Sequence, residues 1–343
     1  MHTDLLLITP GFPKNEDDST CVPPLQVYLH ALRKSRPELN IAVIATDYPY
    51  TPHPYEWHGI PVFPCNGRNR QWRMLITWSR VRKYVDQLVR HGPVKTLHSL
   101  WLGHAAMVGM QMAARTDARH VLTLMGRDAR DGAAWWRRLK QKPISVCLSE
   151  RHGAAFNAMS GSQPDAIIPW GIDPLAATNV SRDIDLLFVG SFSAVKRPMD
   201  FVMLAGGSST DRIIRCAMVG DGPLRGDIQR AIGRLPSAQI ELVGQVDRNE
   251  VLDRMHRSRV LVHTSEYESQ GFVFDEALQC GMSIVSRTVG SARPMERWIL
   301  ADTHQSQLSA ITDMLQRPRG VEPIILHPMK ATADQYLRLY GIA

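Results

Sequence analysis

Two glutamates, Glu268 and Glu276, lie eight positions apart in the segment ESQGFVFDEALQCG. Residues 259–265, just before it, are largely apolar and β-branched, which predicts a buried strand. Residues 272–279 suit a helix, and Gly281 stands where a C-terminal cap is expected. Glu268 would then lie on the loop and Glu276 in the helix. We expect both carboxylates to face the carboxyl end of the strand, where open parallel sheets bind ligands.

The residue types of this segment suit a ligand that carries both sugar and phosphate. Carboxylates accept hydrogen bonds from sugar hydroxyls. Gly271 allows close approach of the backbone, and the unpaired amides of a helix beginning near Phe272 favour phosphate. By spacing alone, two glutamates eight apart are common and carry little information.

A second loop, GSFSAVKR at 190–197, follows another strand-like run. Its Gly-Ser turn leads towards a helix, and Lys196 and Arg197 would stand close to an anion held at the turn. The alternative is an ordinary strand-to-helix turn with solvated basic residues. A third loop, GDGPLRGD at 220–227, has its third glycine one position late for a dinucleotide fingerprint and lacks an acidic ribose partner. We interpret it as a tight turn, which argues against a dehydrogenase.

Strand-like runs alternate with helical patterns along the whole chain, as in parallel α/β sheets. The predicted strands are 5–10, 41–46, 94–100, 120–125, 144–149, 185–190, 213–220, 240–244, 259–265 and 283–287. The clearest predicted helices of the first half are 25–34, 72–89 and 103–114. A stretch rich in turn formers, Pro169 to Arg182, is predicted to be the hinge between two doubly wound domains.

Length and composition fit an ordinary globular protein with two cores. The chain has 343 residues, 44% of them hydrophobic and 21% charged. No apolar run has the length of a membrane span, and the N-terminus reads as a first strand and not as a signal peptide. Five scattered cysteines without CxxC spacing predict reduced thiols in the cytoplasm and no metal site.

The formal charge is +7, and much of it lies in two clusters that contain or follow tryptophans. Trp72 and Trp78 stand within the first, and Trp135 and Trp136 precede the second. The basic residues are Arg68, Arg70, Arg73, Arg80, Arg82, Lys83 and Arg90, then Arg137, Arg138, Lys140 and Lys142. This pattern favours an anionic membrane surface or a polyanionic acceptor. Without a nucleic-acid-binding motif, we do not expect nucleic acid as a partner. The alternative is a solvated helix face whose tryptophans pack inward.

The segment that begins at Glu268 is similar to the E-x7-E segment of family-4 retaining glycosyltransferases, in which Gly271, Glu276, Ala277 and Gly281 also fall in place. The resemblance continues in order through LLFVGSFSAVK, AMVGDGPLR, IELVGQV and RVLVHTSEYE. It is weaker in the first half, in LLLITPGFP, TLMGRD, SVCLSE and IIPWGID. Gln270 replaces the phenylalanine of the usual F-G pair.

This resemblance implies a GT-B fold with two Rossmann-like domains and a cleft between them. The N-terminal domain, 1–172, would shape the acceptor site, and its fold would be completed by the last helix in 329–343. The C-terminal domain, 173–328, would bind the donor. Implied reactants are a nucleoside diphosphate sugar and a glycan or lipid-linked acceptor, with no cofactor required. The implied location is the cytoplasm, at the inner face of the membrane, and the implied process is cell-surface polysaccharide synthesis.

Residue roles follow from the same resemblance. Lys196 matches the lysine that contacts the donor diphosphate, Glu268 the glutamate near the donor sugar, and Glu276 the one on the ribose; Lys196 and Glu268 are the candidate catalytic residues. Further candidate donor contacts are Ser191, Arg197, Gly271, Phe272 and Val273. Candidate acceptor or cleft residues are Gly11, Met125, Arg127 and Asp128.

Two residues, Met125 and Ser191, differ from those usual in the family at positions that bear on the chemistry. Met125 stands where many members have a histidine, and methionine cannot accept a proton. Ser191 stands where arginine is frequent. The implied mechanism is front-face substitution, in which the leaving diphosphate takes the acceptor's proton, so it needs phosphate stabilisation more than a protein base.

Two other hypotheses remain: a catalytically silent protein that binds nucleotide-sugar as a scaffold or sensor, and a nucleotide-sugar epimerase on the same fold.

Overall fold

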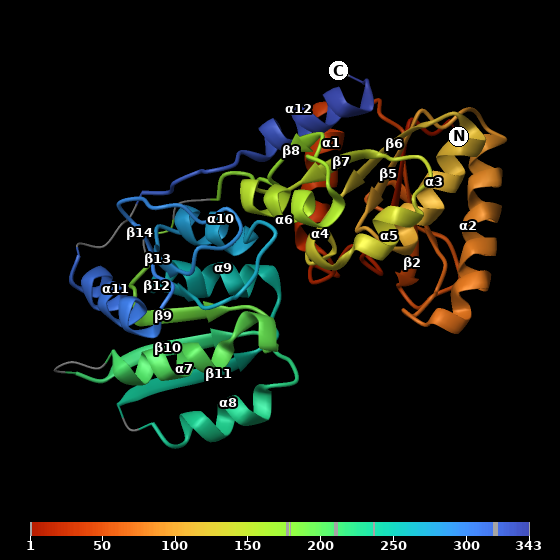
Figure 1. Ribbon diagram of the computed structural model, residues 1–343. Coiled ribbons are helices and arrows are strands. Elements are labelled where there is room, and N and C mark those ends of the chain that lie inside the picture. Colours follow the sequence, from red (N-terminus) through yellow and green to blue (C-terminus); the bar gives the residue numbers. More distant parts are fainter. Residues whose placement is uncertain are drawn as a thin grey trace. The chain divides into compact units, whose positions relative to one another are not determined.

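The computed structural model describes residues 2–175, 178, 180–208, 212–235, 237–317 and 322–342. The chain forms two compact units (Figure 1). Unit 1 comprises Met1–Gly171 and Met329–Ala343, and unit 2 comprises Ile172–Pro328. Each unit has its own sheet and its own core.

Unit 1 contains an eight-stranded sheet in the order β3-β4-β2-β1-β5-β6-β7-β8, and every neighbouring pair except β3–β4 is parallel. Its central strands are fully buried along most of their length, as expected for a sheet covered on both faces. The strands are β1 (Leu5–Gly11), β2 (Ile41–Tyr48), β3 (Tyr55–Trp57), β4 (Ile60–Pro64), β5 (Thr96–Leu100), β6 (Arg119–Thr123), β7 (Ile144–Cys147) and β8 (Ala166–Ile167). The helices are α1 (Pro23–Ser35), the 3-10 turn η1 (Gln71–Arg73), α2 (Met74–Val89), α3 (His104–Thr116), α4 (Asp128–Asp131), α5 (Ala133–Arg138), α6 (Glu150–Ser160) and α12 (Met329–Tyr340).

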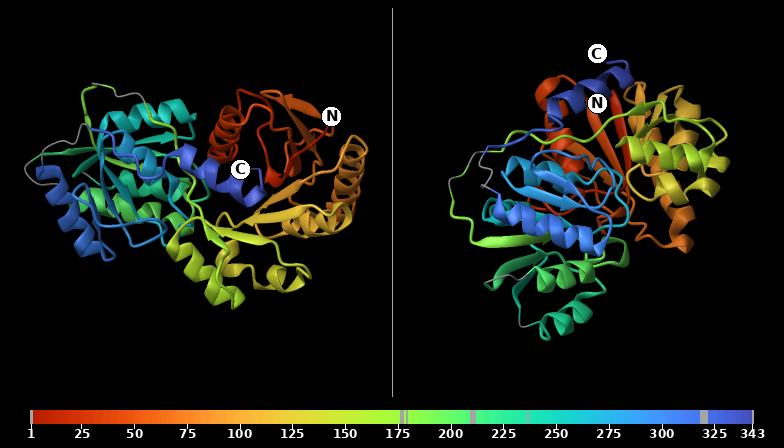
Figure 2. Two further views of the ribbon diagram at one scale, coloured as in Figure 1. Left: turned by 90° about the horizontal axis from the view of Figure 1, so that it is seen from above. Right: turned by 60° about the vertical axis from the view of Figure 1, so that its left-hand side comes forward.

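Helix α12 comes from the far end of the sequence and packs beside α1, as Figure 2 shows for the dark blue and red helices. Tyr340 joins a buried network: its hydroxyl lies 2.5 Å from that of Tyr28 and 2.6 Å from Nδ1 of His98. Tyr336 bonds Thr123 at 2.8 Å. Burial lowers the pKa of His98 to about 3, because charging this imidazole in an apolar core is costly.

Unit 2 contains a six-stranded, wholly parallel sheet in the order β11-β10-β9-β12-β13-β14. Alternate residues of β9 point to opposite cores: Leu186 and Phe188 pack towards α7 and α11, and Leu187 packs with α10 residues. The strands are β9 (Ile184–Val189), β10 (Ile214–Val219), β11 (Ala238–Gly244), β12 (Ser258–His263), β13 (Ser283–Ser286) and β14 (Trp298–Leu300). The helices are the 3-10 turn η2 (Ala194–Lys196), α7 (Pro198–Gly207), α8 (Arg225–Ile232), α9 (Arg248–His256), α10 (Phe272–Gln279) and α11 (His304–Gln316).

All ten predicted strands are confirmed, and their ends shift by at most two residues. The prediction of a helix over 72–89 was wrong at its start, because Gln71–Arg73 is a 3-10 turn and α2 begins at Met74. The hairpin β3–β4 was missed because both strands are short and β4 contains two prolines. Its turn has positive φ at both central residues, His58 (46°) and Gly59 (72°), as two-residue hairpin turns require.

Candidate functional site

Loops after three neighbouring strands of unit 2, β10, β9 and β12, meet at the carboxyl edge of the sheet. The two glycine loops run backbone to backbone: Gly190 donates to the carbonyl of Val219 at 3.0 Å, and Phe192 donates to that of Asp221 at 2.9 Å. A Cβ on Gly220 would lie 1.9 Å from the carbonyl oxygen of Gly190. Gly220 therefore does more than form the tight turn predicted from the sequence: without a side chain, it lets the loops after β9 and β10 approach closely.

The loop after β9 is fixed onto the loop after β12. The hydroxyl of Thr264 donates to the carbonyls of Lys196 and Arg197, both at 2.9 Å. The amide of Glu266 donates to the carbonyl of Val195, also at 2.9 Å. These bonds hold Lys196 opposite Glu268, although the two residues are far apart in sequence.

Lys196, Glu268 and His263 form one polar cluster. The ammonium of Lys196 lies 2.5 Å from Oε1 of Glu268, and Nε2 of His263 lies 2.9 Å from the same oxygen. The Glu268 side chain is only 12% exposed and that of His263 5%, whereas Lys196 keeps 27%. The lysine is thus the member of the cluster that solvent, or an anionic ligand, reaches.

Burial alone raises the pKa of Glu268, but the charge of Lys196 and the hydrogen bond from His263 outweigh it, so that the pKa lies well below the ordinary carboxyl value. Glu268 is consequently a carboxylate at neutral pH. It can orient a cation or accept hydrogen bonds from hydroxyls, and it cannot act as a proton donor.

Helix α10 begins beside this cluster. Its N-cap, Gly271, has φ of 86°, and a Cβ there would lie 2.3 Å from the ring of Phe274. Only glycine fits this entry into the helix. The first turn leaves the amides of Phe272 and Val273 without intrahelical acceptors, so that the helix presents N–H donors and its positive end at the carboxyl edge.

Glu276 lies one turn further along α10, and its side chain is 10% exposed. It accepts a hydrogen bond from Nε of Arg248, at the start of α9, at 2.9 Å. Burial raises the pKa of Glu276, and the charge of Arg248 opposes that rise. Sequence reasoning missed Arg248, because it lies 28 positions before its partner and its helix carries no motif.

The other residues expected at the donor site are placed as follows. Ser191 is exposed, and its hydroxyl lies 2.9 Å from that of Ser193. Arg197 has a positive φ of 48° and its guanidinium pairs with Asp200 and Glu266. Its charge is therefore largely neutralised by its neighbours.

A second buried polar group on α10 was missed by sequence reasoning. Asp275 is 1% exposed and bonds Nδ1 of His327 at 2.8 Å and Nε2 of Gln270 at 3.4 Å. These contacts join the start of α10 to the segment that leads towards α12. Gln270 thus has a structural hydrogen bond at the position where the phenylalanine was expected.

The expected acceptor residues lie in unit 1. Asp128 is a backbone cap: its carboxylate accepts the amides of Leu102 at 2.8 Å, Gly126 at 2.7 Å and Met125 at 3.2 Å. Burial raises its pKa against these three bonds. Arg127 is paired with Asp131 at 2.7 Å. Gly11, at the end of β1, has room for a Cβ, which would lie 3.5 Å from Sγ of Cys21.

Two features are absent from the described part of the chain. None of its helices is long and apolar enough to cross a membrane. None of its His, Cys, Asp and Glu side chains gather in groups of three or more that could hold a metal ion.

Comparison with protein families matches residues 176–297 to the family described as Glycosyl transferases group 1. The match contains every site residue of unit 2 described above except His327. A curated relative, the gpi3 subunit of the phosphatidylinositol N-acetylglucosaminyltransferase of Schizosaccharomyces pombe, is 33% identical over 115 residues. That alignment covers 30% of this chain and 24% of the relative, so the chain spans about a quarter of the relative's length.

Solved structures resemble the whole chain. HepE of Anabaena, in complex with UDP and glucose, has a TM-score of 0.70 at 16% identity and covers 98% of this chain and 96% of its own. Sucrose-phosphate synthase of Thermosynechococcus elongatus has a TM-score of 0.72 at 16% identity, with 98% of both chains covered. At these identities the likeness establishes the fold: two α/β domains of GT-B type. Together with the family match in unit 2, it supports a glycosyltransferase.

Proposed function

We propose that this protein is a retaining glycosyltransferase that moves a sugar from a nucleoside diphosphate sugar to a glycan or lipid-linked acceptor. The observation that carries the proposal is the cluster of Lys196, Glu268 and His263 beside the open first turn of α10. It lies within the segment that matches the glycosyltransferase family. HepE, of the same fold, has been captured with UDP and with UDP-glucose, which supports UDP as the first nucleotide to test.

In this proposal, each group has a distinct task in donor binding. The amides of Phe272 and Val273 and the ammonium of Lys196 receive the diphosphate, since both present positive charge at the carboxyl edge. Glu276 accepts hydrogen bonds from the ribose hydroxyls, with Arg248 fixing its carboxylate. Glu268 holds Lys196 in position and accepts bonds from hydroxyls of the donor sugar.

The proposed chemical step is a front-face substitution at the anomeric carbon. The bond from that carbon to the diphosphate oxygen breaks, a bond to the acceptor oxygen forms on the same face, and the acceptor's proton passes to the departing diphosphate. The protein contributes by stabilising charge on the leaving group, which preorganised amides and a lysine do without reorganisation. Met125 in place of a histidine is compatible with this step, because no protein base is required.

The proposal extends to biological context. The curated relative is named for the transfer of N-acetylglucosamine to phosphatidylinositol, which supports a lipid-linked acceptor here. We propose that the product belongs to cell-surface polysaccharide synthesis and that the protein works in the cytoplasm at the inner face of the membrane.

The test is release of nucleoside diphosphate from UDP-glucose, UDP-N-acetylglucosamine and GDP-mannose, with and without a membrane lipid extract as acceptor source. We expect turnover of one donor substrate, reduced at least about a hundredfold in Lys196→Ala, since removal of one hydrogen-bond donor to the transition state costs on that order. Glu268→Ala should lose a similar amount, because Glu268 holds the Lys196 ammonium in position. Lys34→Ala, which changes an exposed lysine on α1 of unit 1 outside both basic clusters, is the control. Unchanged turnover in both site variants would refute the site assignment.

The same experiment separates the two other hypotheses. A silent scaffold binds nucleotide without releasing diphosphate from any donor. An epimerase converts a donor into its epimer without acceptor, which chromatography of the sugar nucleotides detects. Either result would replace the transferase proposal.

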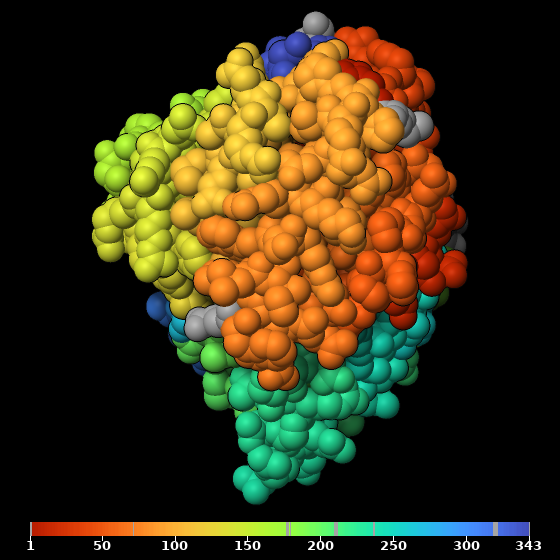
Figure 3. Space-filling model, turned by 90° about the vertical axis from the view of Figure 1, so that its right-hand side faces the viewer, coloured from red at the N-terminus to blue at the C-terminus, as the bar shows by residue number. Residues whose placement is uncertain are grey.

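We also propose that the segment 68–83 contacts an anionic membrane. Trp72, Leu75 and Ile76 are 70%, 77% and 46% exposed, and η1 and α2 form much of the orange surface of the face in Figure 3. No acidic residue stands in this segment. Bulky apolar side chains among unopposed basic ones suit the boundary of an anionic bilayer. Trp136, by contrast, is 7% exposed and belongs to the core.

Sedimentation with phosphatidylglycerol vesicles tests this contact. Trp72→Ala combined with Leu75→Ser should release the protein from the vesicles, as should high salt. Met203→Ser, which removes another exposed apolar side chain (52%) from unit 2, should leave it bound. Equal retention of all three proteins would refute the assignment of this surface.

A further inference from the structure

His263 is the last residue of β12, and its imidazole is buried at the carboxyl edge of the sheet of unit 2. Its backbone is paired with Ser286 of β13. Its ring packs edge-on against that of Phe274, in the first turn of α10, with the ring centroids 4.6 Å apart. The imidazole is therefore held by both the sheet and the helix, so its Nε2 has a fixed place.

The two carboxylate oxygens of Glu268 have different surroundings. Oε1 lies 2.9 Å from Nε2 of His263 and 2.5 Å from the ammonium of Lys196. A carboxylate only accepts hydrogen bonds, so Nε2 of His263 carries the proton of this bond. Oε2 has no hydrogen bond to a described residue, and it is not sealed from solvent. A ligand can therefore reach Oε2, whereas Oε1 is occupied by the protein.

The stem of the Glu268 side chain is confined as well. Gly290, in the loop after β13, has φ of 54°, and a Cβ there would lie 2.9 Å from Cβ of Glu268. Ser291 donates to the carbonyl of Gln270 through its amide at 2.8 Å and through its hydroxyl at 2.9 Å. These contacts hold the loop that carries Glu268 against the loop after β13. With its stem and Oε1 both held, the carboxylate has a defined orientation.

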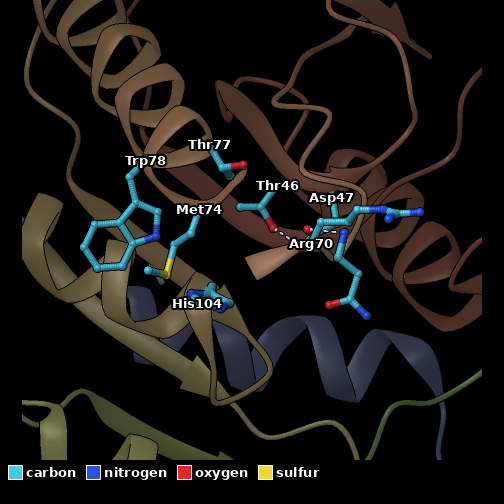
Figure 4. A pocket seen from close by; sticks show the side chains of 8 residues that line it. Thr46, Asp47, Arg70, Met74, Thr77, Trp78 and His104 are labelled. Carbon is cyan, nitrogen blue, oxygen red and sulfur yellow. Dashed lines mark hydrogen bonds between the residues drawn. The ribbon is translucent and has the colours of Figure 1, made fainter. Parts of the chain in front are cut away.

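A buried imidazole does not by itself indicate a role in a ligand site. His104, at the start of α3 in unit 1, resembles His263 in having a buried Nδ1 without a partner among the described residues. The ring of His104 packs against that of Trp135 at 4.7 Å, and its side chain forms no hydrogen bond to a described residue. Figure 4 shows it beside Met74 in a hollow of about 30 Å³, which has room for roughly two waters. His263 differs because a carboxylate that the proposed function uses accepts its hydrogen bond.

The free oxygen of Glu268 suits a sugar hydroxyl and not a diphosphate. A carboxylate oxygen accepts hydrogen bonds and offers none, and the oxygens of an ionised diphosphate also only accept. The diphosphate instead suits Lys196 and the open amides of Phe272 and Val273. A sugar hydroxyl can donate to Oε2, and a carboxylate that is already oriented loses less freedom when it accepts that bond.

We propose that His263 is a positioning residue for donor recognition: its Nε2–H orients the Glu268 carboxylate so that Oε2 accepts a hydrogen bond from one hydroxyl of the donor sugar. The inference rests on the proposed function, which it deepens by assigning recognition of the sugar, and not of the nucleotide, to this pair. Loss of the His263 bond should consequently weaken binding of a nucleotide-sugar while leaving binding of its diphosphate intact.

The test is calorimetric binding of UDP, UDP-glucose, UDP-N-acetylglucosamine, GDP and GDP-mannose to the wild-type protein and three variants. His263→Leu removes the N–H donor at similar size. His263→Gln restores a donor, since its amide nitrogen lies the same number of bonds from Cβ as Nε2 of histidine. His304→Leu, the same change at an exposed histidine at the start of α11, is the matched control.

The measured quantity is the affinity for a nucleotide-sugar relative to the affinity for its own diphosphate. We expect the same ratio in the wild-type protein and His304→Leu. In His263→Leu the ratio should fall about tenfold, as for one lost hydrogen bond, while the affinity for the diphosphate stays unchanged because Lys196 keeps its bond to Glu268. His263→Gln should recover most of the ratio.

A purely structural role of His263 would weaken both ligands together. An equal loss of diphosphate and nucleotide-sugar binding in His263→Leu would therefore overturn the inference, as would an unchanged ratio in that variant. The same holds if His263→Gln behaves like His263→Leu. A wild-type protein that binds neither UDP nor GDP would instead refute the proposed function, and the inference with it.

Discussion

Replacing Glu268 by glutamine is expected to destabilise unit 2 by about 2–3 kcal/mol. Removing one partner of a fully buried ion pair costs about 3–5 kcal/mol, and an exposed pair contributes about 0–1 kcal/mol. The pair of Lys196 and Glu268 lies nearer the buried case, because its side chains are 27% and 12% exposed and its charged atoms lie 2.5 Å apart. Lys196→Met should cost a similar amount, since it leaves the carboxylate with His263 alone.

The double variant Lys196→Met/Glu268→Gln should be more stable than the sum of the single effects predicts, by about 2 kcal/mol, because neither charge is then left unpaired. The control cycle is Arg230→Met with Asp227→Asn, an exposed pair on α8 of the same unit, with side chains 68% and 52% exposed. It should give a coupling of about 0.3–0.5 kcal/mol.

Hydrogen exchange of the β9 and β12 amides measures these free energies within unit 2 without requiring the whole chain to unfold in one step. The coupling should persist from pH 8 to pH 5. The pKa of Glu268 is depressed in the folded state, so its contribution is fully present above the ordinary carboxyl value of about 4.3 and is lost only as pH falls further. A coupling near zero, or one that disappears between pH 7 and pH 5, would refute this reasoning.

Two further perturbations have defined outcomes. Gly271→Ala should lower the melting temperature and weaken UDP binding, because its Cβ would lie 2.3 Å from the Phe274 ring. Gly226→Ala in α8, whose Cβ would lie 3.5 Å from its nearest neighbour, should neither lower the melting temperature nor weaken UDP binding. The pKa of His98 is about 3 in the folded protein, so between pH 6 and pH 4 only the unfolded chain takes up a proton at this residue. The free energy of unfolding therefore falls as the pH is lowered through this range. His98→Gln should reduce the slope of unfolding free energy against pH by roughly 1.4 kcal/mol per pH unit. An unchanged slope in denaturant titrations of His98→Gln, or wild-type behaviour of Gly271→Ala, would contradict the respective argument.

The segment from 259 to 281 shows what a sequence pattern can predict. Its strand, loop and helix follow from an apolar run, a polar turn and a helical period, and Gly281 has the positive φ of 74° that a residue after a helix end often adopts. Local rules suffice there because each element is decided by its own residues.

Pairings between distant residues could not be predicted in this way. Arg248 reaches Glu276, and Lys196 reaches Glu268, through loops whose contact depends on the order of strands in the sheet. His263 was part of a predicted strand, where a buried side chain is the ordinary expectation. Its membership of the polar cluster follows from the distance of 2.9 Å between its Nε2 and Oε1 of Glu268, which no sequence pattern encodes.

Unit 1 shows a second reason for missed features. The positive φ values of Asn66, Arg68 and Asn69 have no sequence signature beyond two asparagines. The tryptophans of the two basic clusters looked alike in sequence, yet Trp72 is 70% exposed and Trp136 only 7%. Exposure of an aromatic residue depends on which face of the helix the core covers, and composition does not determine that face.

The most direct test of the central claim is calorimetric binding of UDP, GDP and ADP to the wild-type protein, Glu276→Ala and Glu250→Ala. Glu276 bonds Arg248 at the proposed ribose position, whereas Glu250 is exposed near the start of the same α9 helix as Arg248. The account predicts binding of one diphosphate that Glu276→Ala weakens about tenfold or more and Glu250→Ala leaves unchanged. Absence of binding by all three nucleotides, or equal binding to all three proteins, would contradict it.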